Sequence, residues 1–109
     1  MSYVYLLHFE RPISPKHTCQ HYLGTAEDLA GRIQQHERGG RLAARLCQVA
    51  HERGIAFRVA RVWLGGRELE RRLKDRKGSP RLCPLCAGEV KPGLFELTAA
   101  QIEEALLPF

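Results

Sequence analysis

The stretch HYLGTAEDLAGRIQQHERGG, residues 21–40, joins the end of a strand pattern to the pattern of an amphipathic helix. Thr25 and Asp28 have the three-residue spacing of a capping box, which predicts a helix that begins near Ala26. The pair Gly39-Gly40 can adopt the left-handed backbone conformation that ends helices. We therefore expect one helix that runs from about Ala26 to these two glycines.

Within this helix an arginine and a histidine lie one turn apart. With about 100° of rotation per residue, Arg32 and His36 share one face of the helix. That face lies about 60° from the stripe formed by Leu29 and Ile33, which we expect to face the core. Both polar side chains should therefore lie at the edge of the core, where they can reach a ligand.

Two strands are expected before this helix. The segment YVYLLHF, Tyr3 to Phe9, is β-branched and aromatic with little alternation, which is typical of a central strand covered on both faces. Residues 11–17 contain two prolines and are expected to form a loop, and residues 18–24 predict a second strand that ends at Gly24. Two consecutive strands with this connection predict an antiparallel hairpin.

Beyond residue 40 the periodicity predicts a helix over 41–54, a strand over 56–63, a helix over 67–77 and a short helix within 98–109. Leu42, Leu46 and Val49 form the expected inner stripe of the first of these helices. Gly54 is its expected stop signal. These elements complete a mixed pattern of strands and helices.

The chain of 109 residues is long enough for one domain with a small hydrophobic core. Residues 1–86 hold sixteen basic and eight acidic residues, whereas residues 87–109 hold one basic and four acidic residues. We predict a domain over 1–86 and an acidic C-terminal extension over 87–109 that packs on it. Thr98 and Gln101 have the spacing of a cap for the terminal helix.

The net charge of +8 on residues 1–86 favours a polyanionic partner such as nucleic acid, because neutralised phosphates release their condensed counterions. The alternative is that the many arginines reflect coding bias and that no nucleic acid binds. The sequence has no run of about 18 apolar residues, and its start is typical of a strand rather than of a signal peptide. We therefore predict no membrane partner and a cytoplasmic location.

Several short motifs follow one another in a specific order. YVY, Tyr3 to Tyr5, is followed by YLG, Tyr22 to Gly24, and Arg32 comes eight residues after that glycine. His36 lies one turn further on, and Glu70 lies in the predicted third helix. In order and spacing these motifs resemble the GIY-YIG nuclease family over roughly residues 3–86.

The resemblance implies an α+β fold, with a three-stranded antiparallel sheet flanked by helices in the order β-β-α-α-β-α and a short C-terminal helix after it. It also implies a phosphodiester hydrolase with one divalent metal ion, Mg²⁺ or Mn²⁺. By position, Tyr5 and Tyr22 would face the scissile phosphate and Arg32 would bind it. His36 would assist proton movement, and Glu70 would hold the metal.

Two positions depart from the family pattern. Tyr3 stands where the first signature has a glycine, and the region where the family carries an asparagine reads KGSPRLCPLC here. A catalytically weak nucleic-acid-binding module on the same scaffold therefore stays open as an alternative. Glu70 could also form a helical ion pair with Lys74, which would stabilise the protein by only roughly 0.3 kcal/mol.

A basic strip is predicted along the third helix and the residues after it. Residues 67–81 hold seven basic and three acidic residues, and Leu69 and Leu73 are expected to face the core. Contacts of this kind carry affinity without reading sequence. The candidate phosphate-binding residues are Arg67, Arg71, Lys74 and Lys77. The alternative is an ordinary solvated helix.

The four cysteines, at positions 19, 47, 83 and 86, are too scattered to predict a disulfide framework. Cys83 and Cys86 have half of a zinc-site spacing, and the other half would have to come from Cys19, Cys47, a histidine or another chain. Mg²⁺ or Mn²⁺ is the cofactor we expect, and zinc at these cysteines is an alternative. A zinc-stabilised adaptor whose basic strip binds an acidic protein would be the matching function.

From these features we predict a metal-dependent endonuclease that hydrolyses DNA phosphodiester bonds, with little sequence specificity, in DNA repair or processing. An RNA substrate stays open, and the sequence makes no prediction of oligomeric state.

Overall fold

The computed structural model describes residues 2–13, 20–75, 82–87 and 95–107. Three strands form one antiparallel sheet in the spatial order β2-β1-β3: β1 Tyr3–Phe9, β2 His21–Ala26 and β3 Phe57–Leu64. The first strand is central, as its continuous apolar pattern predicts. The expected α+β class with a three-stranded antiparallel sheet is confirmed.

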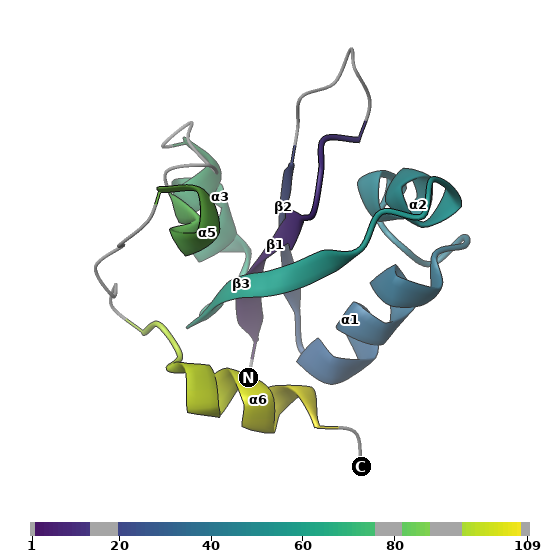
Figure 1. The fold of residues 1–109 in the computed structure, drawn as a ribbon. Helices are drawn as coiled ribbons and strands as arrows, with labels where there is room; N and C mark the ends of the chain where they lie inside the picture. Colours follow the sequence, from purple (N-terminus) through teal and green to yellow (C-terminus); the bar gives the residue numbers. More distant parts are fainter. Residues whose placement is uncertain (1, 14–19, 76–81, 88–94, 108–109) are drawn as a thin grey trace.

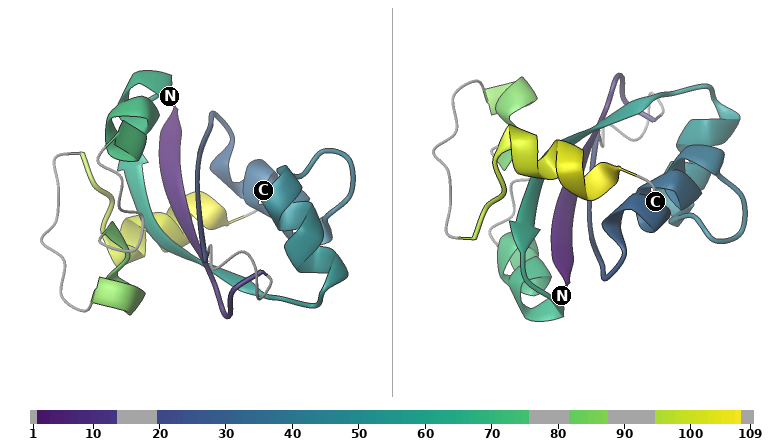
Figure 2. Two further views of the ribbon diagram at one scale, coloured as in Figure 1. Left: turned by 90° about the horizontal axis from the view of Figure 1, so that it is seen from above. Right: turned by 90° about the horizontal axis from the view of Figure 1, so that it is seen from below.

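Helices cover both faces of this sheet. They are α1 Leu29–Arg38, α2 Arg45–Glu52, α3 Arg67–Asp75, the four-residue α5 Pro84–Ala87 and α6 Ala99–Leu106. Figures 1 and 2 show α1 and α2 on one side of the sheet and α3 and α5 on the other. The fold thus has a helical layer on each face, and α5 was not expected from the sequence.

Alternate side chains of β1 enter two separate cores, because successive residues of a strand point to opposite faces. Tyr5, Leu7 and Phe9 pack in the core beneath α1 and α2. Val4 and Leu6 pack in the second core, together with α3. The second core contains Leu23, Trp63, Leu73 and Cys83, with Leu69 packed against it. Leu73 and Leu69 therefore form the inner stripe of α3, as predicted.

The start of α1 differs from its prediction. Strand β2 continues past Gly24 to Ala26, and Thr25 pairs with Val4 across the sheet, so the chain there is still extended. Asp28 is the N-cap residue, and its carboxylate accepts a hydrogen bond from the backbone N–H of Gly31 at 3.1 Å. The Thr25–Asp28 capping box was therefore wrong. The predicted end at Gly39 is confirmed, with a φ of 68°.

The helix predicted over 41–54 is shorter than expected, since α2 begins only at Arg45. The chain turns after Gly40, where the N–H of Ala43 donates to the Gly40 carbonyl at 3.3 Å. As a result Leu42 is 71% exposed, and its predicted place in the inner stripe was wrong. Cys47 and Ala50 are the buried residues of α2. Gly54, with a φ of 68°, follows the helix as predicted.

Residues 95–97 lie along the outer edge of β3. Trp63 and Glu96 form an antiparallel bridge, and the N–H of Leu97 donates to the carbonyl of Val62 at 2.8 Å. Helix α6 follows at once. Thr98 caps it in a complete capping box with Gln101, as predicted. The apolar residues that pack this segment on the first core are Leu97, Ile102, Ala105 and Leu106. The division of the chain at residues 86 and 87 stays a prediction.

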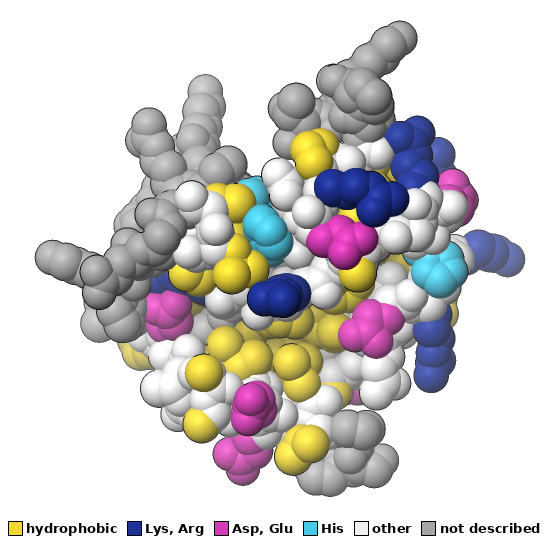
Figure 3. Space-filling model, viewed as in Figure 1, with side chains coloured by type: hydrophobic (Ala, Val, Ile, Leu, Met, Phe, Trp, Pro, Cys, Tyr) yellow, Lys and Arg dark blue, Asp and Glu magenta, His cyan; other side chains and the backbone are white. Residues whose placement is uncertain are grey.

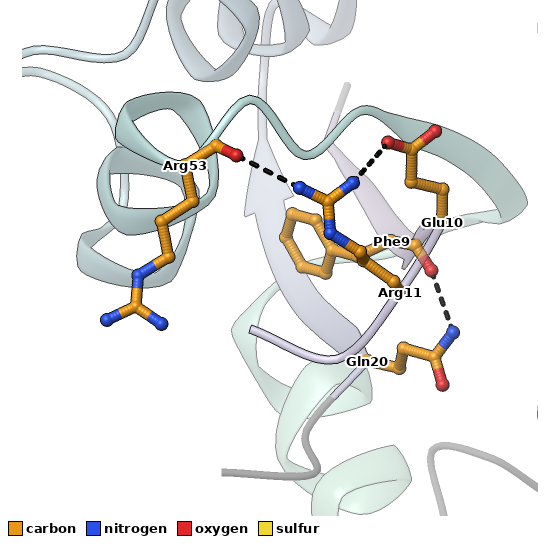
Figure 4. Close-up of polar contacts among 5 residues, drawn as sticks. All are labelled: Phe9, Glu10, Arg11, Gln20 and Arg53. Carbon is orange, nitrogen blue, oxygen red and sulfur yellow. Dashed lines mark hydrogen bonds and ion pairs between the residues drawn. The ribbon is translucent and has the colours of Figure 1, made fainter. Parts of the chain in front are cut away.

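Polar contacts hold the chain where it leaves β1 (Figure 4). The guanidinium of Arg11 donates to the Glu10 carboxylate at 3.2 Å and to the carbonyl of Arg53 at 3.1 Å. The side-chain amide of Gln20 donates to the carbonyl of Phe9 at 3.1 Å. The Arg11 contact ties the chain just after β1 to the residue that follows α2, and the Gln20 contact ties the end of β1 to the residue before β2. In the part of the chain that the structure describes, no helix has both the length and the apolar character needed to cross a bilayer.

Candidate functional site

Four of the predicted site residues meet on the face of the sheet that α1 covers. The hydroxyl of Tyr5 on β1 lies 2.7 Å from Nε2 of His36 on α1, within hydrogen-bonding distance. The ring of Tyr22 on β2 lies 6.2 Å from that of Tyr5 and 5.6 Å from the imidazole, centroid to centroid. Burial raises the pKa of Tyr5 and lowers that of His36, and the Arg32 guanidinium, one turn before His36, opposes the first shift and adds to the second. We call these residues the tyrosine cluster.

Gly24 allows the two tyrosines to approach. It pairs with Tyr5 across the sheet, and the Tyr5 ring lies directly over it. A Cβ atom at this position would lie 2.6 Å from the Tyr5 hydroxyl oxygen and 2.8 Å from Cε2 of Tyr22. The glycine of the YLG motif is therefore required for the close approach of the rings, whereas the sequence had indicated only the end of a strand.

The hydrogen-bond partners of His36 determine which ring nitrogen carries its proton. The backbone N–H of Ala44 donates to Nδ1 at 3.3 Å, so Nδ1 carries a lone pair. Burial, with a contribution from the nearby Arg32 guanidinium, lowers the pKa of His36 to about 4. At neutral pH the ring is therefore uncharged, and its Nε2–H donates to the Tyr5 hydroxyl.

The cluster has an inner and an outer part. Tyr5 and His36 are 0% and 1% exposed, whereas Tyr22 and Arg32 are half-buried and reach the surface. Burial raises the pKa of Tyr5 well above its usual value, and Tyr22 adds to the rise, whereas the Arg32 guanidinium opposes it. Tyr5 therefore keeps its proton at neutral pH unless positive charge is added nearby. The Arg32 guanidinium also donates to the carbonyl of Leu42 at 2.6 Å.

A pocket of about 450 Å³ has His36 in its lining. It is lined by His36, Glu37, Cys47, Ala50, His51, Gly54, Ile55, Ala56 and Phe57. Neither tyrosine nor Arg32 lines it. A phosphate would therefore meet the tyrosine cluster at its outer part, at Tyr22 and Arg32, and not in this pocket.

Glu70 forms an ion pair on α3. It lies on α3, which covers the opposite face of the sheet, and its carboxylate pairs with Nζ of Lys74 at 2.7 Å. Its side chain is 19% exposed. Mg²⁺ prefers several oxygen ligands, but here the predicted ligand is a single carboxylate whose oxygen already contacts an ammonium group. Among the described residues no group of three or more metal-ligating side chains includes Glu70, and its role as a metal ligand stays a prediction.

Part of the predicted basic strip is seen on α3. Arg67, Arg71 and Lys74 are exposed, whereas Lys77 lies outside the described residues. Lys74 is paired with Glu70, and the described ion pairs do not involve Arg67 or Arg71. On the face seen in Figure 3, Lys and Arg side chains gather towards the α2 end, and acidic side chains lie across the centre and over α6. The surface is thus of mixed charge on that face.

A second cluster lies on the face that α3 and α5 cover. It comprises His8, His21, Cys83 and Cys86, whose ligand atoms all lie within 4.8 Å of one another. This cluster could hold a metal ion, and its nitrogen and sulfur donors suit zinc better than magnesium. We call it the His/Cys cluster. Sequence reasoning had singled out the two cysteines but neither histidine, and Cys47 lies in the other core.

Comparison with known proteins found no match to a family model, to a curated protein or to a solved structure. Membership of the GIY-YIG family therefore stays a prediction, and the assignment of function rests on the residues and their geometry.

Proposed function

We propose that this protein hydrolyses phosphodiester bonds in nucleic acid, with DNA as the first substrate to test, as a small nuclease of the GIY-YIG type. The observation that carries the proposal is the convergence of Tyr5, Tyr22, Arg32 and His36, from three separate elements, on one point. These residues are those to which the resemblance assigns contacts with the scissile phosphate. Their convergence supports the proposal independently of the spacing that first indicated it.

The outer part of the tyrosine cluster would bind the phosphate. Arg32 offers a planar fork of N–H donors that matches two non-bridging phosphate oxygens, and it is half-buried, so solvent screens its charge less than at the surface. Charge develops on those oxygens as water attacks phosphorus and the bond to the leaving oxygen breaks. Arg32 would therefore stabilise the transition state more than the bound substrate.

The inner part of the tyrosine cluster, Tyr5 and His36, would take part in removing the proton from the attacking water. The attacking water must lose a proton, and Tyr5 could accept it only after losing its own proton to solvent, which at neutral pH requires added positive charge near the phenol because burial raises its pKa. His36 would help here as a donor, because its Nε2–H points to the Tyr5 oxygen and stabilises negative charge on that oxygen. This role differs from that of a histidine base, which would need Nε2 without a proton. A divalent metal, if the reaction requires one, would supply additional positive charge.

A binding module without turnover is the second candidate, and the pairing of Glu70 with Lys74 on the other face of the sheet favours it. On that reading the basic residues of α3 bind phosphates, and the tyrosine cluster only supports the fold. Both candidates predict that DNA affinity falls steeply as salt rises. Turnover, which only the nuclease would show, separates them.

The deciding experiment is the nicking of supercoiled DNA in Mg²⁺, in Mn²⁺ and in EDTA, by wild type, Arg32→Ala and Arg38→Ala. Arg38 is an exposed arginine of the same helix, so its variant is the matched control for loss of one positive charge. For a nuclease, Arg32→Ala should lose at least about tenfold more turnover than DNA affinity, whereas Arg38→Ala should nick like wild type. Salt-sensitive binding without nicking in any metal would reject the nuclease and leave the binding module.

A further inference from the structure

The two histidines of the His/Cys cluster face each other across the hairpin. His8 and His21 are direct partners in the antiparallel register of β1 and β2, so their side chains lie on the same face of the sheet. Nδ1 of His8 lies 3.2 Å from Nε2 of His21. The pairing therefore presents two imidazole nitrogens at a fixed position on the face that α3 covers.

The two cysteines reach the same position from α5. The backbone N–H of Cys86 donates to the carbonyl of Cys83 at 3.2 Å, and this turn brings both sulfurs to one side. Sγ of Cys83 lies 3.4 Å from Nδ1 of His8. Sγ of Cys86 lies 3.5 Å from the same nitrogen and 3.3 Å from Nε2 of His21. The four ligand atoms thus surround one point.

Hydrogen bonds alone do not account for this arrangement. An imidazole nitrogen carries either one proton or one lone pair, so it forms one strong hydrogen bond. Nδ1 of His8 nevertheless has three neighbours at 3.2–3.5 Å, which are one nitrogen and two sulfurs. Several nitrogen and sulfur atoms at similar distances from one another are instead expected where they are ligands of one metal ion.

The distances match a tetrahedral zinc site. With Zn–N near 2.05 Å and Zn–S near 2.3 Å, a tetrahedron has edges of about 3.3 Å between nitrogens, about 3.6 Å between nitrogen and sulfur and about 3.8 Å between sulfurs. The observed nitrogen–nitrogen separation is 3.2 Å, and the nitrogen–sulfur separations are 3.3–3.5 Å. These four pairs agree with the tetrahedral edges to within a few tenths of an ångström. The other two pairs, which are Cys83 Sγ with His21 Nε2 and the two sulfurs with each other, lie within 4.8 Å.

We propose that His8, His21, Cys83 and Cys86 bind one structural zinc ion, which fastens the α5 segment to the β1–β2 hairpin. Four protein ligands fill a tetrahedral coordination sphere, so the ion has no open position for catalysis. The site stands apart from the tyrosine cluster and does not depend on the proposed nuclease activity.

A buried arginine of β3 forms a hydrogen bond to the residue just before the first cysteine ligand. Nη1 of Arg61 on β3 donates to the carbonyl of Leu82 at 3.2 Å, directly before the first cysteine ligand. Arg61 is itself held by the Glu96 carboxylate and lies over the Trp63 ring, 4.7 Å from its centroid. Contacts of this kind orient metal ligands in other sites. Cys83, which follows Leu82, is fully buried in the second core.

The test measures zinc in the full-length protein, purified with a reductant and without added metal, by mass spectrometry of the metal content. Wild type should hold one zinc per chain. Cys86→Ser changes the exposed cysteine ligand, so misfolding is least expected there, and the variant should hold less than a tenth of that amount. Cys47→Ala removes a thiol in the other core and should keep the full amount.

Two further measurements separate the site from its alternatives. Replacement of zinc by Co²⁺ should give the intense visible bands of a tetrahedral sulfur and nitrogen site in wild type and Cys47→Ala but not in Cys86→Ser. A strong chelator should lower the Tm of wild type by at least about 5 °C and leave that of Cys86→Ser unchanged. Three results would each overturn the proposal. They are less than one zinc per chain in wild type, a loss of zinc in Cys47→Ala equal to that in Cys86→Ser, and a disulfide between Cys83 and Cys86 that persists in the protein purified with a reductant.

Discussion

Tyr5 and His36, 31 positions apart in the chain, are joined by a hydrogen bond of 2.7 Å between the phenol oxygen and Nε2, in the interior of the protein. The backbone N–H of Ala44 holds the other ring nitrogen, so the histidine is the donor in this bond. The bond links the central strand to α1, and it places a potential stabiliser of negative charge at the Tyr5 oxygen. The bond should therefore affect both the free energy of unfolding and the proposed proton transfer at Tyr5.

Tyr5→Phe should separate these two effects. The change keeps the ring but leaves the Nε2–H of His36 buried without its acceptor, which should lower the free energy of unfolding by about 1–3 kcal/mol. Tyr22→Phe is the matched control, since the Tyr22 hydroxyl has no hydrogen bond among the described contacts and lies nearer the surface. Urea unfolding of the three proteins measures the difference. Equal stability of both variants would mean that the Tyr5–His36 bond contributes little.

The lowered pKa of His36 predicts a pH dependence of stability. In the folded protein the imidazole, which Tyr5, Tyr22 and Arg32 surround, has a pKa of about 4, compared with 6.5 when unfolded. Between these values the unfolded chain binds a proton that the folded chain does not, so stability falls as pH falls from 6.5 towards 4. The loss should be on the order of 3 kcal/mol.

His36→Gln tests this assignment, because it removes the titrating group and keeps an N–H donor for Tyr5. Unfolding curves of wild type and variant, measured from pH 7.5 to pH 4, contain the same contributions from all other groups. Their difference should be constant above pH 7 and should shrink as the pH falls below 6.5. A constant difference over the whole range would show that His36 is not the group responsible.

Gly24→Ala should disturb the tyrosine cluster directly. The added methyl group would lie 2.6 Å from the Tyr5 hydroxyl oxygen, so one of the rings must move. We expect a loss of about 1–3 kcal/mol in stability and, if the protein is a nuclease, a loss of turnover in the folded fraction. Gly66→Ala is the control, because a methyl group there would meet no atom within 4 Å. Thermal melting and nicking assays at matched concentration measure both effects.

The ion pair of Arg61 with Glu96 should be the most costly one to break. Both side chains are nearly buried, at 7% and 12% exposure, and the guanidinium donates to both carboxylate oxygens. Glu96→Ala would leave a buried, unpaired arginine and should cost about 3–5 kcal/mol. Glu68→Ala, which breaks the exposed pair with Arg72, should cost less than about 0.5 kcal/mol. Similar costs for the two variants would contradict the burial argument.

Local patterns predicted the elements better than their boundaries and contacts. The apolar run of β1 and the capping box of α6 needed only neighbouring residues, and both predictions hold. The spacing of Thr25 and Asp28 was misleading because pairing of Thr25 with Val4 keeps the chain extended there. Strand pairing, which is a tertiary property, took precedence over a local signal.

The two clusters differ in how much of each was predictable. Arg32 and His36 could be placed on one helix face by arithmetic, whereas the approach of His8 to His21 depends on the register of the hairpin, which the sequence leaves open. A signal was present, since each histidine alternates with a residue of the second core, Leu6 and Leu23 respectively. Two histidines on the inner face of neighbouring strands, with a Cys-x-x-Cys segment elsewhere, would have justified the search for zinc.

The resemblance and the structure give the Glu70 carboxylate different partners. The resemblance assigns a metal to its carboxylate, whereas the structure pairs the carboxylate with Lys74 on the face opposite the tyrosine cluster. Glu68 on the same helix is paired in the same way with Arg72, four residues on, but it is 83% exposed compared with 19% for Glu70. Glu68→Gln and Glu70→Gln therefore each remove one charge and one helical ion pair.

If the carboxylate of Glu70 is required for turnover, Glu70→Gln should lower nicking by at least about a hundredfold, because an amide lacks the charge that a hard cation requires. Glu68→Gln should nick like wild type, and both variants should melt within a few degrees of it, because helical ion pairs contribute only about 0.3–0.5 kcal/mol. DNA affinity in EDTA should rise slightly and equally in both, since each loses one negative charge beside the basic residues of α3. Nicking by Glu70→Gln at the wild-type rate would instead make the ion pair with Lys74 the whole role of Glu70, and a metal ion, if one is needed, would then have to bind elsewhere.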